Sequence, residues 1–413
     1  MGSVSETSQL YVALLTAGRD RPYAFGMGTA LMSAGISLDI IGANDLDGPQ
    51  WHDKPHVRFL NMRGDISDTA CFPKKVWRIL DYYIRLLFYS LRTKAKIFHI
   101  LWNNKFEAFD RVPLMLFYKL LGKKTLLTVH NVNTRVRDSR DSWFNRFTLG
   151  IQYRLIDHLF VHTERMRQEL IDHYGVPAEK ITVIPFGINN AVPHTDLSPQ
   201  EARQRLGISE NDRTILFFGN IAPYKGLEYL IEAFRQVMIH GKDYRLIIAG
   251  NPKNCESYWT DIQDSIDSHA NHDRILRKIE FIPDAETEVY FKAADIVVLP
   301  YRHIFQSGVL SLGYSFGVPV IASDVGSLRE DIVEGKTGFL CKPEDPIDLS
   351  RAIQDYFSSP LYGELAKHRR DIQDYARQKY SWDLVCQMTL VVYAKLLNER
   401  NTNKVIDSLA RCI

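Results

Sequence analysis

The sequence predicts an α/β protein built from two doubly wound parallel sheets. The chain has 413 residues, more than the roughly 100–200 of a usual domain, so we expect two domains, each with its own core. Short β-branched and apolar runs alternate with longer helical stretches, as is typical of parallel sheets. Between two such series lies segment 189–213, where Pro193, Pro199, Asn211 and Asp212 indicate an interdomain connection.

The strands are expected in two series, one on either side of that connection. The first comprises Tyr11–Leu15, Leu38–Gly42, Ile97–Leu101, Thr125–Val129, Leu159–Val161 and Ile181–Ile184. The second comprises Thr214–Phe218, Arg245–Ala249, Ile279–Phe281, Ile296–Leu299 and Val320–Ile321, with helices such as Leu227–His240 between them. Ligands of open parallel sheets lie beyond the carboxyl ends of the strands, so the residues that follow each strand form the candidate site.

The composition indicates an ordinary globular protein of a reducing compartment. Its 51 Lys and Arg nearly balance 49 Asp and Glu, which argues against a nucleic-acid partner. Five scattered cysteines form no close pair and suit a cytoplasmic protein better than a disulfide framework. The first ten residues lack the pattern of a secretory signal, and no apolar run approaches the ~20 residues of a membrane-spanning helix.

In the first series, two loops carry candidate acceptor-side residues. Gly18 and Arg19 follow the first strand in a glycine-containing turn, where acceptor contact and a plain turn are both open. His130 and Asn131 follow the strand Thr125–Val129, and a histidine at such a rim can hydrogen-bond to a sugar hydroxyl or cap the next element. No Asp-x-Asp motif comes directly after a strand, so we expect no metal site, and we expect no cofactor either.

In the second series, two loops have the features of phosphate cradles. Gly219 through Gly226 follow a strand and open a helix, and Lys225 is placed as a point charge for a phosphate. The loop after Ile296–Leu299 leads through Gln306, Ser307 and Gly308 into another helix, whose free amides can bind a second anion. Two cradles in one domain indicate a diphosphate ligand.

Several segments together resemble the retaining GT-B glycosyltransferases of family 4, over most of the chain. The resemblance rests on segments whose order and spacing are specific even though each is modest. They are Phe218–Asn220 with Lys225-Gly226 and Leu230–Phe234, then Ala293–Asp295 before Leu299-Pro300, then Phe316–Ser323 with Gly326 and Gly338. Val183–Ile188 and Ser381-Trp382 are similar to the family's two crossings between domains.

The resemblance implies two Rossmann-like domains that face a cleft. The first, 1–188, would bind the acceptor and be joined by a returning helix in 383–413, and the second, 189–382, would bind the donor. The implied reaction moves a sugar, without metal and with retention, from a nucleoside diphosphate sugar, a UDP-sugar first and GDP-mannose second. The acceptor would be a glycan, a lipid-linked sugar or a small molecule.

The resemblance also implies roles for individual residues. Lys225 and the amides near Ser307, Gly308 and Val309 would stabilise the leaving diphosphate, and His130 would reach the donor sugar in the transition state.

Two departures from the family pattern leave the donor open. Asn220 stands where the family has an arginine, which Arg302 could replace, and Ile304 and Leu312 stand where it has two glutamates. These losses motivate an alternative, a catalytically impaired sugar-nucleotide-binding or partner subunit. A nicotinamide oxidoreductase is a third class, but it requires a glycine fingerprint that the first loop lacks.

One helix suggests a membrane surface as a further partner. Segment Lys74–Lys96 contains seven basic side chains and one acidic side chain, Asp81, interleaved with aromatic residues. Such a helix suits an anionic lipid interface on the inner face of the membrane. A core-facing stripe with a solvated basic face explains the pattern equally well, and this stripe would comprise Ile79, Leu80, Tyr83, Leu86, Leu87 and Leu91.

Overall fold

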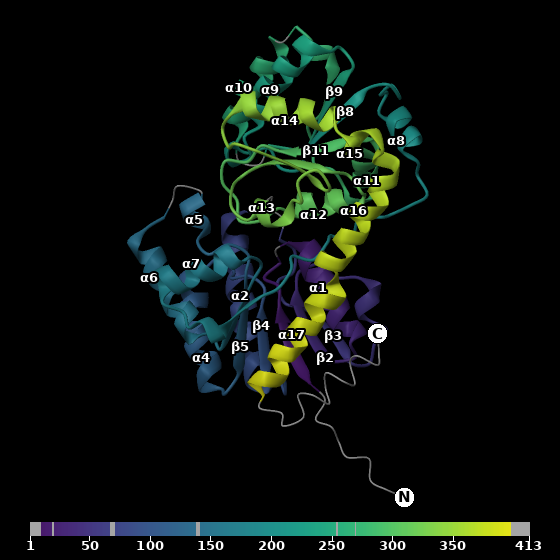
Figure 1. Ribbon diagram of the computed structural model, residues 1–413. Coiled ribbons are helices and arrows are strands. Elements are labelled where there is room, and N and C mark those ends of the chain that lie inside the picture. The colour runs from purple at the N-terminus through teal and green to yellow at the C-terminus, as the bar shows by residue number, and fades with distance from the viewer. Residues whose placement is uncertain are drawn as a thin grey trace, which may run out of the picture. The chain divides into compact units, whose positions relative to one another are not determined.

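The chain forms two compact units, each an α/β layer structure (Figure 1). The structure, a computed structural model, describes residues 10–18, 20–66, 71–137, 141–252, 255–268 and 270–397. Unit 1 comprises Met1–Gly187 and Trp382–Ile413, and unit 2 comprises Ile188–Ser381. In the described parts, each unit holds one parallel sheet, as the sequence predicts for the GT-B architecture.

Unit 1 contains a 7-stranded sheet of order β3-β2-β1-β4-β5-β6-β7. All of its pairings are parallel, and the strands between the two edges are almost entirely buried because helices cover both faces. The strands are β1 (Tyr11–Leu15), β2 (Ser37–Gly42), β3 (Val57–Asn61), β4 (Ile97–Ile100), β5 (Lys124–Val129), β6 (His158–Val161) and β7 (Ile181–Val183).

The helices of unit 1 lie in two layers. Right-handed crossovers place the helix that leads to β2 on one face and the helices that lead to β4, β5 and β6 on the other face. The helices are α1 (Arg21–Ser33), α2 (Phe72–Arg92), α3 (Glu107–Phe109), the π-helical turn η2 (Asp110–Leu114), α4 (Met115–Leu120), α5 (Thr134–Arg137), α6 (Trp143–Leu155), α7 (Glu164–Tyr174) and α17 (Trp382–Leu396).

The last helix, α17, packs beside α1 in unit 1 (Figure 1). The Cys386 thiol donates to the Ala30 carbonyl, and Tyr393 Oη lies 2.6 Å from His99 Nδ1 on β4. The indole of Trp382 fills the space beside two glycines, since a Cβ on Gly26 or Gly187 would lie 2.1 or 2.3 Å from it. The end of the described chain thus completes the core of unit 1.

Unit 2 contains a 6-stranded parallel sheet of order β10-β9-β8-β11-β12-β13. Its strands are β8 (Arg213–Phe218), β9 (Tyr244–Ala249), β10 (Ile275–Lys278), β11 (Ile296–Leu299), β12 (Val320–Ser323) and β13 (Gly338–Cys341). Its helices are α8 (Pro199–Arg205), the 3₁₀ turn η4 (Pro223–Lys225), α9 (Leu227–His240), α10 (Glu256–Asp267), α11 (Asp284–Ala293), α12 (Gly308–Ser315), α13 (Leu328–Asp331), α14 (Pro346–Phe357), α15 (Pro360–Gly363) and α16 (Leu365–Tyr380).

The sequence interpretation was wrong at the sheet edges. The strand expected at Ile279–Phe281 lies earlier, at Ile275–Lys278, and Phe281 is 73% exposed. Edge strand β10 pairs only with β9, so it tolerates polar side chains such as Arg277 and does not stand out as an apolar run. Two further edge strands, β3 and β13, were also missed, whereas the fourth edge strand, β7, was predicted as Ile181–Ile184.

Helix α2 is apolar on two sides. The core-facing stripe suggested by the sequence is correct at Ile79, Tyr83 and Leu86, which are buried, but wrong at Leu80 and Leu91, which are 45% and 58% exposed. No helix in the described ranges is both long and apolar enough to cross a membrane.

Candidate active site

The strand order reverses at one place in each sheet, between β1 and β4 in unit 1 and between β8 and β11 in unit 2. Loops that leave a doubly wound sheet at such a switch point diverge and leave a crevice for ligands. In unit 2, the loops after β8 and β11 are the two cradles predicted from the sequence. In unit 1, the loop after β4 contains Trp102, and His130 directly follows the neighbouring strand β5.

Lys225 is a buried cation at the switch point of unit 2. It ends η4 and is only 6% exposed, with its Nζ atom 6.0 Å from the centre of the Phe217 ring and 5.5 Å from that of Tyr301. Among the described residues, no carboxylate makes an ion pair with it. Burial lowers the pKa of Lys225 to about 8. An unpaired ammonium in such surroundings is poised to bind an anion.

Two glycines let the loops around Lys225 approach each other. Gly219 has φ +97°, and a Cβ on it would lie 3.0 Å from Lys225 Nζ and 3.6 Å from a methyl of Val309. Gly226 has φ +63°, and a Cβ there would lie 2.1 Å from the carbonyl oxygen of Pro300. A side chain at position 226 would separate the β8 loop from the β11 loop, whereas at position 219 the positive φ is what favours glycine.

The amino terminus of α12 forms the other wall of this cradle. Ser307 is the N-cap, but its side chain accepts no capping bond from the helix and instead lies 3.3 Å from the Tyr301 hydroxyl. The amides of Gly308 and Val309 begin the helix and are among those without an intrahelical acceptor. In the described structure, the buried Oε1 of Gln306 also has no hydrogen-bond partner. Lys225, Gly219 and the start of α12 thus lie together on one surface that has the features of an anion-binding site.

Arg302 does not join this surface. Its guanidinium pairs with Glu228 at 2.8 Å and Glu344 at 3.6 Å, and it donates to the hydroxyl of Tyr229. Asn220 is exposed. Arg302 is therefore committed to carboxylates and does not replace the arginine that the family has at position 220.

The positions of the two absent glutamates serve packing. Leu312 is 5% exposed in the core of unit 2. The Ile304 carbonyl lies against Gly326, where a Cβ would approach it to 1.6 Å. Neither place offers a carboxylate to a sugar or ribose, and two nearby buried polar atoms, Gln306 Oε1 and Ser327 Oγ, lack a partner among the described residues.

His130 lies in an aromatic cage in unit 1. Its ring stacks on Trp102 with centroids 4.1 Å apart and meets the edge of Tyr23 at 4.6 Å. Burial, and then the neighbouring His162, hold the pKa of His130 well below its usual range. Burial also lowers the pKa of His162 to about 4. Both imidazoles are therefore neutral at pH 7.

Hydrogen bonds fix the tautomer of His130. His162 Nδ1 lies 3.2 Å from the Ile184 carbonyl, which can only accept, so this nitrogen carries the proton. His162 Nε2 is then the acceptor for His130 Nδ1, at 3.2 Å. His130 must donate from Nδ1, which leaves a lone pair on Nε2. That Nε2 atom is buried and makes no hydrogen bond of standard geometry with another described residue, although the backbone of Leu101 also interacts with this imidazole and raises its pKa.

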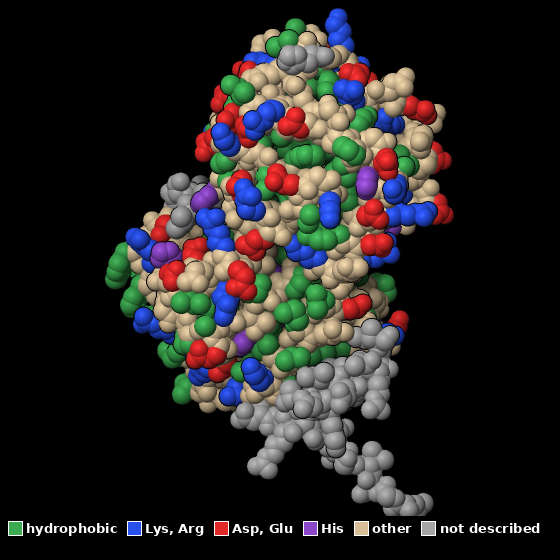
Figure 2. All heavy atoms as spheres, in the orientation of Figure 1, with side chains coloured by type: hydrophobic (Ala, Val, Ile, Leu, Met, Phe, Trp, Pro, Cys, Tyr) green, Lys and Arg blue, Asp and Glu red, His purple; other side chains and the backbone are tan. Residues whose placement is uncertain are grey.

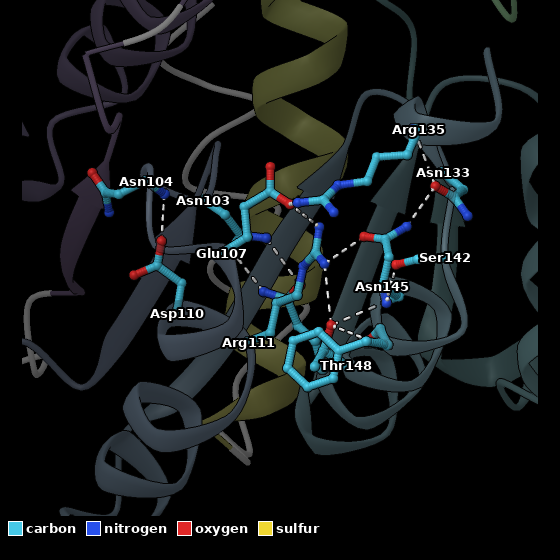
Figure 3. A network of polar contacts seen from close by, with 12 residues as sticks. Asn103, Asn104, Glu107, Asp110, Arg111, Asn133, Arg135, Ser142, Asn145 and Thr148 are labelled. Carbon is cyan, nitrogen blue, oxygen red and sulfur yellow. Dashed lines mark hydrogen bonds and ion pairs between the residues drawn. The ribbon is translucent and has the colours of Figure 1, made fainter. Parts of the chain in front are cut away.

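A cavity of about 110 Å³ adjoins His130 and Asn131 at the carboxyl ends of β4 and β5. A polar network lines it (Figure 3), in which Arg111 pairs with Glu107 at 2.8 Å and donates to Asn145 at 2.8 Å. The side-chain amides of Asn103 and Gln152 form two hydrogen bonds with each other, of 3.0 and 2.8 Å. These bonds fix the side chains before any ligand arrives, as recognition of sugar hydroxyls requires.

Sequence reasoning missed this network. Its only local signal is the i, i+4 pair Glu107 and Arg111, and the partner Asn145 lies on another helix. Of the predicted acceptor-side residues, Asn131 lines the cavity, Gly18 lies after β1 with φ +66° outside the lining, and Arg19 lies outside the described residues.

Family models match both units of the chain. The model "Glycosyltransferase Family 4" matches residues 23–192, and "Glycosyl transferases group 1" matches residues 198–379, so together they account for most of the sequence. The chain belongs to the GT-B glycosyltransferases. Within this glycosyltransferase, the group 1 match contains the Lys225 cradle and the Family 4 match contains His130.

Relatives and solved structures agree with this family. The D-inositol 3-phosphate glycosyltransferase of Corynebacterium aurimucosum is 27% identical over 287 residues, 66% of this chain and 65% of the relative, so the match spans just under two thirds of its length. Sucrose-phosphate synthase from Thermosynechococcus elongatus superposes with a TM-score of 0.73 at 18% identity, over 94% of this chain and 99% of that one. Anabaena Alr3699/HepE in complex with UDP-glucose has a TM-score of 0.70 at 16% identity, over 94% and 99%.

Proposed function

We propose that the protein transfers a sugar from a nucleoside diphosphate sugar to an acceptor, with retention at the anomeric carbon and without a metal ion. The observation that carries the proposal is the buried, unpaired Lys225 beside Gly219 and the first amides of α12. These groups supply the positive charge that a departing diphosphate requires, a task that a divalent cation performs in metal-dependent transferases.

A UDP-sugar is our first choice of donor, and GDP-mannose is the second. The choice is supported by the solved structure of HepE, which holds UDP-glucose in the same fold. The cradle contacts assigned above are to the diphosphate, so they are the same for either base. We assign the cradle to Lys225, Gly219, Ser307, Gly308 and Val309.

His130 acts on the sugar in this proposal. Its Nε2 lone pair accepts a hydrogen bond from a donor-sugar hydroxyl and so orients the sugar while positive charge develops at the anomeric carbon. Because the imidazole is neutral, it adds no charge that would oppose the oxocarbenium-like transition state. The acceptor, whether a glycan, a lipid-linked sugar or a small molecule, uses the cavity that Arg111, Asn103 and Gln152 line.

An impaired, sugar-nucleotide-binding subunit is the second candidate, because Ile304 and Leu312 leave the cradle without the family's carboxylates. The unpaired Nε2 of His130 favours the enzyme, since a binding subunit has no use for a buried acceptor held in one tautomer.

We also assign the protein to the cytoplasm, in keeping with four free cysteines in the described residues.

The test has two stages. A thermal-shift screen of UDP, GDP, ADP and dTDP in EDTA identifies the base, since a ligand that binds the folded state raises its stability. Proton NMR then follows the matching sugar nucleotide during incubation with candidate acceptors. We expect nucleoside diphosphate release and a product with the donor's anomeric configuration. Binding without any turnover would support the binding subunit, and inversion would contradict the proposed mechanism.

A further inference from the structure

Helix α2 carries an apolar stripe that the described protein leaves uncovered. Its exposed residues recur at intervals of three or four positions and therefore share one side of the helix, opposite Ile79, Tyr83 and Leu86, which are buried. The exposed residues are Trp77 (67%), Leu80 (45%), Ile84 (50%), Phe88 (53%) and Leu91 (58%). A surface helix of a globular protein needs only one apolar side, which packs on the core. The second stripe therefore indicates an interaction surface.

The same helical layer carries further exposed apolar side chains. Leu116 and Leu120 of α4 are 46% and 86% exposed. On α6, Trp143 and Phe147 stack with centroids 5.7 Å apart, and Phe144 beside them is also exposed. Figure 2 shows hydrophobic side chains gathered along the edge of unit 1 that carries α4 and α6. Together these residues and the α2 stripe are the outer apolar face.

Contacts between the helices show that α2, α4 and α6 belong to one connected helical layer. The Tyr83 hydroxyl of α2 donates to Asp110 of η2 at 2.8 Å, and Arg111 of η2 donates to Asn145 of α6. Helix α4 continues η2 and contacts α6. All of these helices lie on the face of the sheet to which right-handed crossovers assign them, so their outer sides point away from the same sheet.

The charge around the outer apolar face is strongly positive. Segment 72–124 contains twelve Lys and Arg but only three Asp and Glu, whereas the whole chain has 51 and 49. Two of its acids are paired with a cation of the same segment, Asp81 with Arg85 and Glu107 with Arg111, and the third, Asp110, is buried and accepts a hydrogen bond from Tyr83. The exposed cations in the segment are Lys74, Arg85, Arg92, Lys94, Lys96 and Lys105.

We propose that the outer apolar face of α2, α4 and α6 docks on an anionic lipid bilayer. Tryptophan, phenylalanine and leucine side chains enter the interfacial zone, and the surrounding Lys and Arg bind lipid headgroups, which is the combination that interfacial helices use. A second copy of the chain fits less well, because it would bring one positive face against another. Given the transfer activity proposed above, docking implies a lipid-linked acceptor.

Vesicle co-sedimentation of the full chain tests the docking. One set of vesicles is phosphatidylcholine alone, and the other contains equal parts of phosphatidylcholine and phosphatidylglycerol. We expect binding to the anionic vesicles at low salt and its loss at high salt, because salt screens the headgroup attraction. The double variant Lys94→Glu, Lys96→Glu should weaken this binding.

Matched apolar variants test the face itself. Trp77→Ser with Phe88→Ser should reduce anionic-vesicle partition about tenfold or more, because burial of each large apolar side chain is lost. The control is Phe281→Ser with Ile347→Ser, two side chains of unit 2 that are 73% and 69% exposed, and it should bind vesicles like the unchanged chain. A cooperative melting curve like that of the unchanged chain, recorded without ligand, shows that the fold of each variant is intact.

Three results would overturn the docking. They are a protein that stays in the supernatant with anionic vesicles at low salt, equal binding by the Trp77 variant and the Phe281 control, and a lipid-free dimer that the Trp77 variant dissociates in sedimentation velocity. Failure of docking is distinguishable from failure of the proposed function. A protein that binds UDP but no vesicles loses only the docking, and one that binds vesicles but no nucleoside diphosphate loses only the transfer.

Discussion

Replacement of Lys225 by methionine should stabilise the unliganded protein. Burial holds the Lys225 pKa at about 8, below its ordinary 10.5, so the folded state disfavours the ammonium. The difference corresponds to about 3 kcal/mol of lost stability at pH 7. This penalty is complete below pH 8 and disappears as the pH rises toward 10.5, where the unfolded chain also loses the proton. Methionine fills a similar volume without charge, so Lys225→Met should melt several degrees higher at pH 7 and show little difference near pH 10.

The same replacement should weaken binding of the diphosphate. Loss of a charge-assisted contact weakens UDP binding by about 1.5–3 kcal/mol, a 10- to 150-fold change. For the unchanged protein, affinity should be level below pH 8 and fall above it, because the free lysine loses the attracting charge there. Calorimetric titration of UDP in EDTA from pH 6.5 to 9.5, with melting curves at the ends of that range, measures both effects. A variant that melts lower at pH 7 and binds UDP unchanged would refute the reasoning.

Three further predictions concern catalysis. His130→Ala should lower turnover about 100-fold or more yet leave UDP affinity within about threefold, since the bond to the sugar strengthens in the transition state; equal loss in both would make the residue structural. His162→Ala should lower turnover at unchanged donor KM by freeing the His130 tautomer, and His162→Gln should recover part of it; no recovery would indicate a packing role. EDTA should leave transfer unchanged, whereas a strict need for manganese or magnesium would reject the lysine-based mechanism.

The loops that we propose as the donor cradle could be located from the sequence because their determinants are local. Gly219, Gly226 and Lys225 lie within one loop, and a glycine followed by a helix start indicates an anion site before any fold is known. Central strands such as β8 and β11 were likewise visible, since burial on both faces makes them continuous apolar runs. Arg302 could not be placed, because its partners Glu228 and Glu344 lie far from it in the sequence.

The acceptor-side cavity and the exposed face needed the fold. Arg111 contacts Asn145 only when η2 packs against α6, and the spacing of these two residues in the sequence does not indicate the contact. In α2, the helical period places apolar residues on two sides at once, and sequence alone does not show which side the sheet covers. The tautomer of His130 depended in the same way on His162 and on the Ile184 carbonyl, which come from neighbouring strands' ends.

A crystal structure of the full chain with UDP in the presence of EDTA tests the central proposal most directly. We expect the diphosphate to lie against the Gly219 loop, with Lys225 Nζ and the amides of Gly308 and Val309 at hydrogen-bond distance and no metal ion between them. A diphosphate bound elsewhere, or one that occupies the cradle only with a divalent cation, would contradict the account.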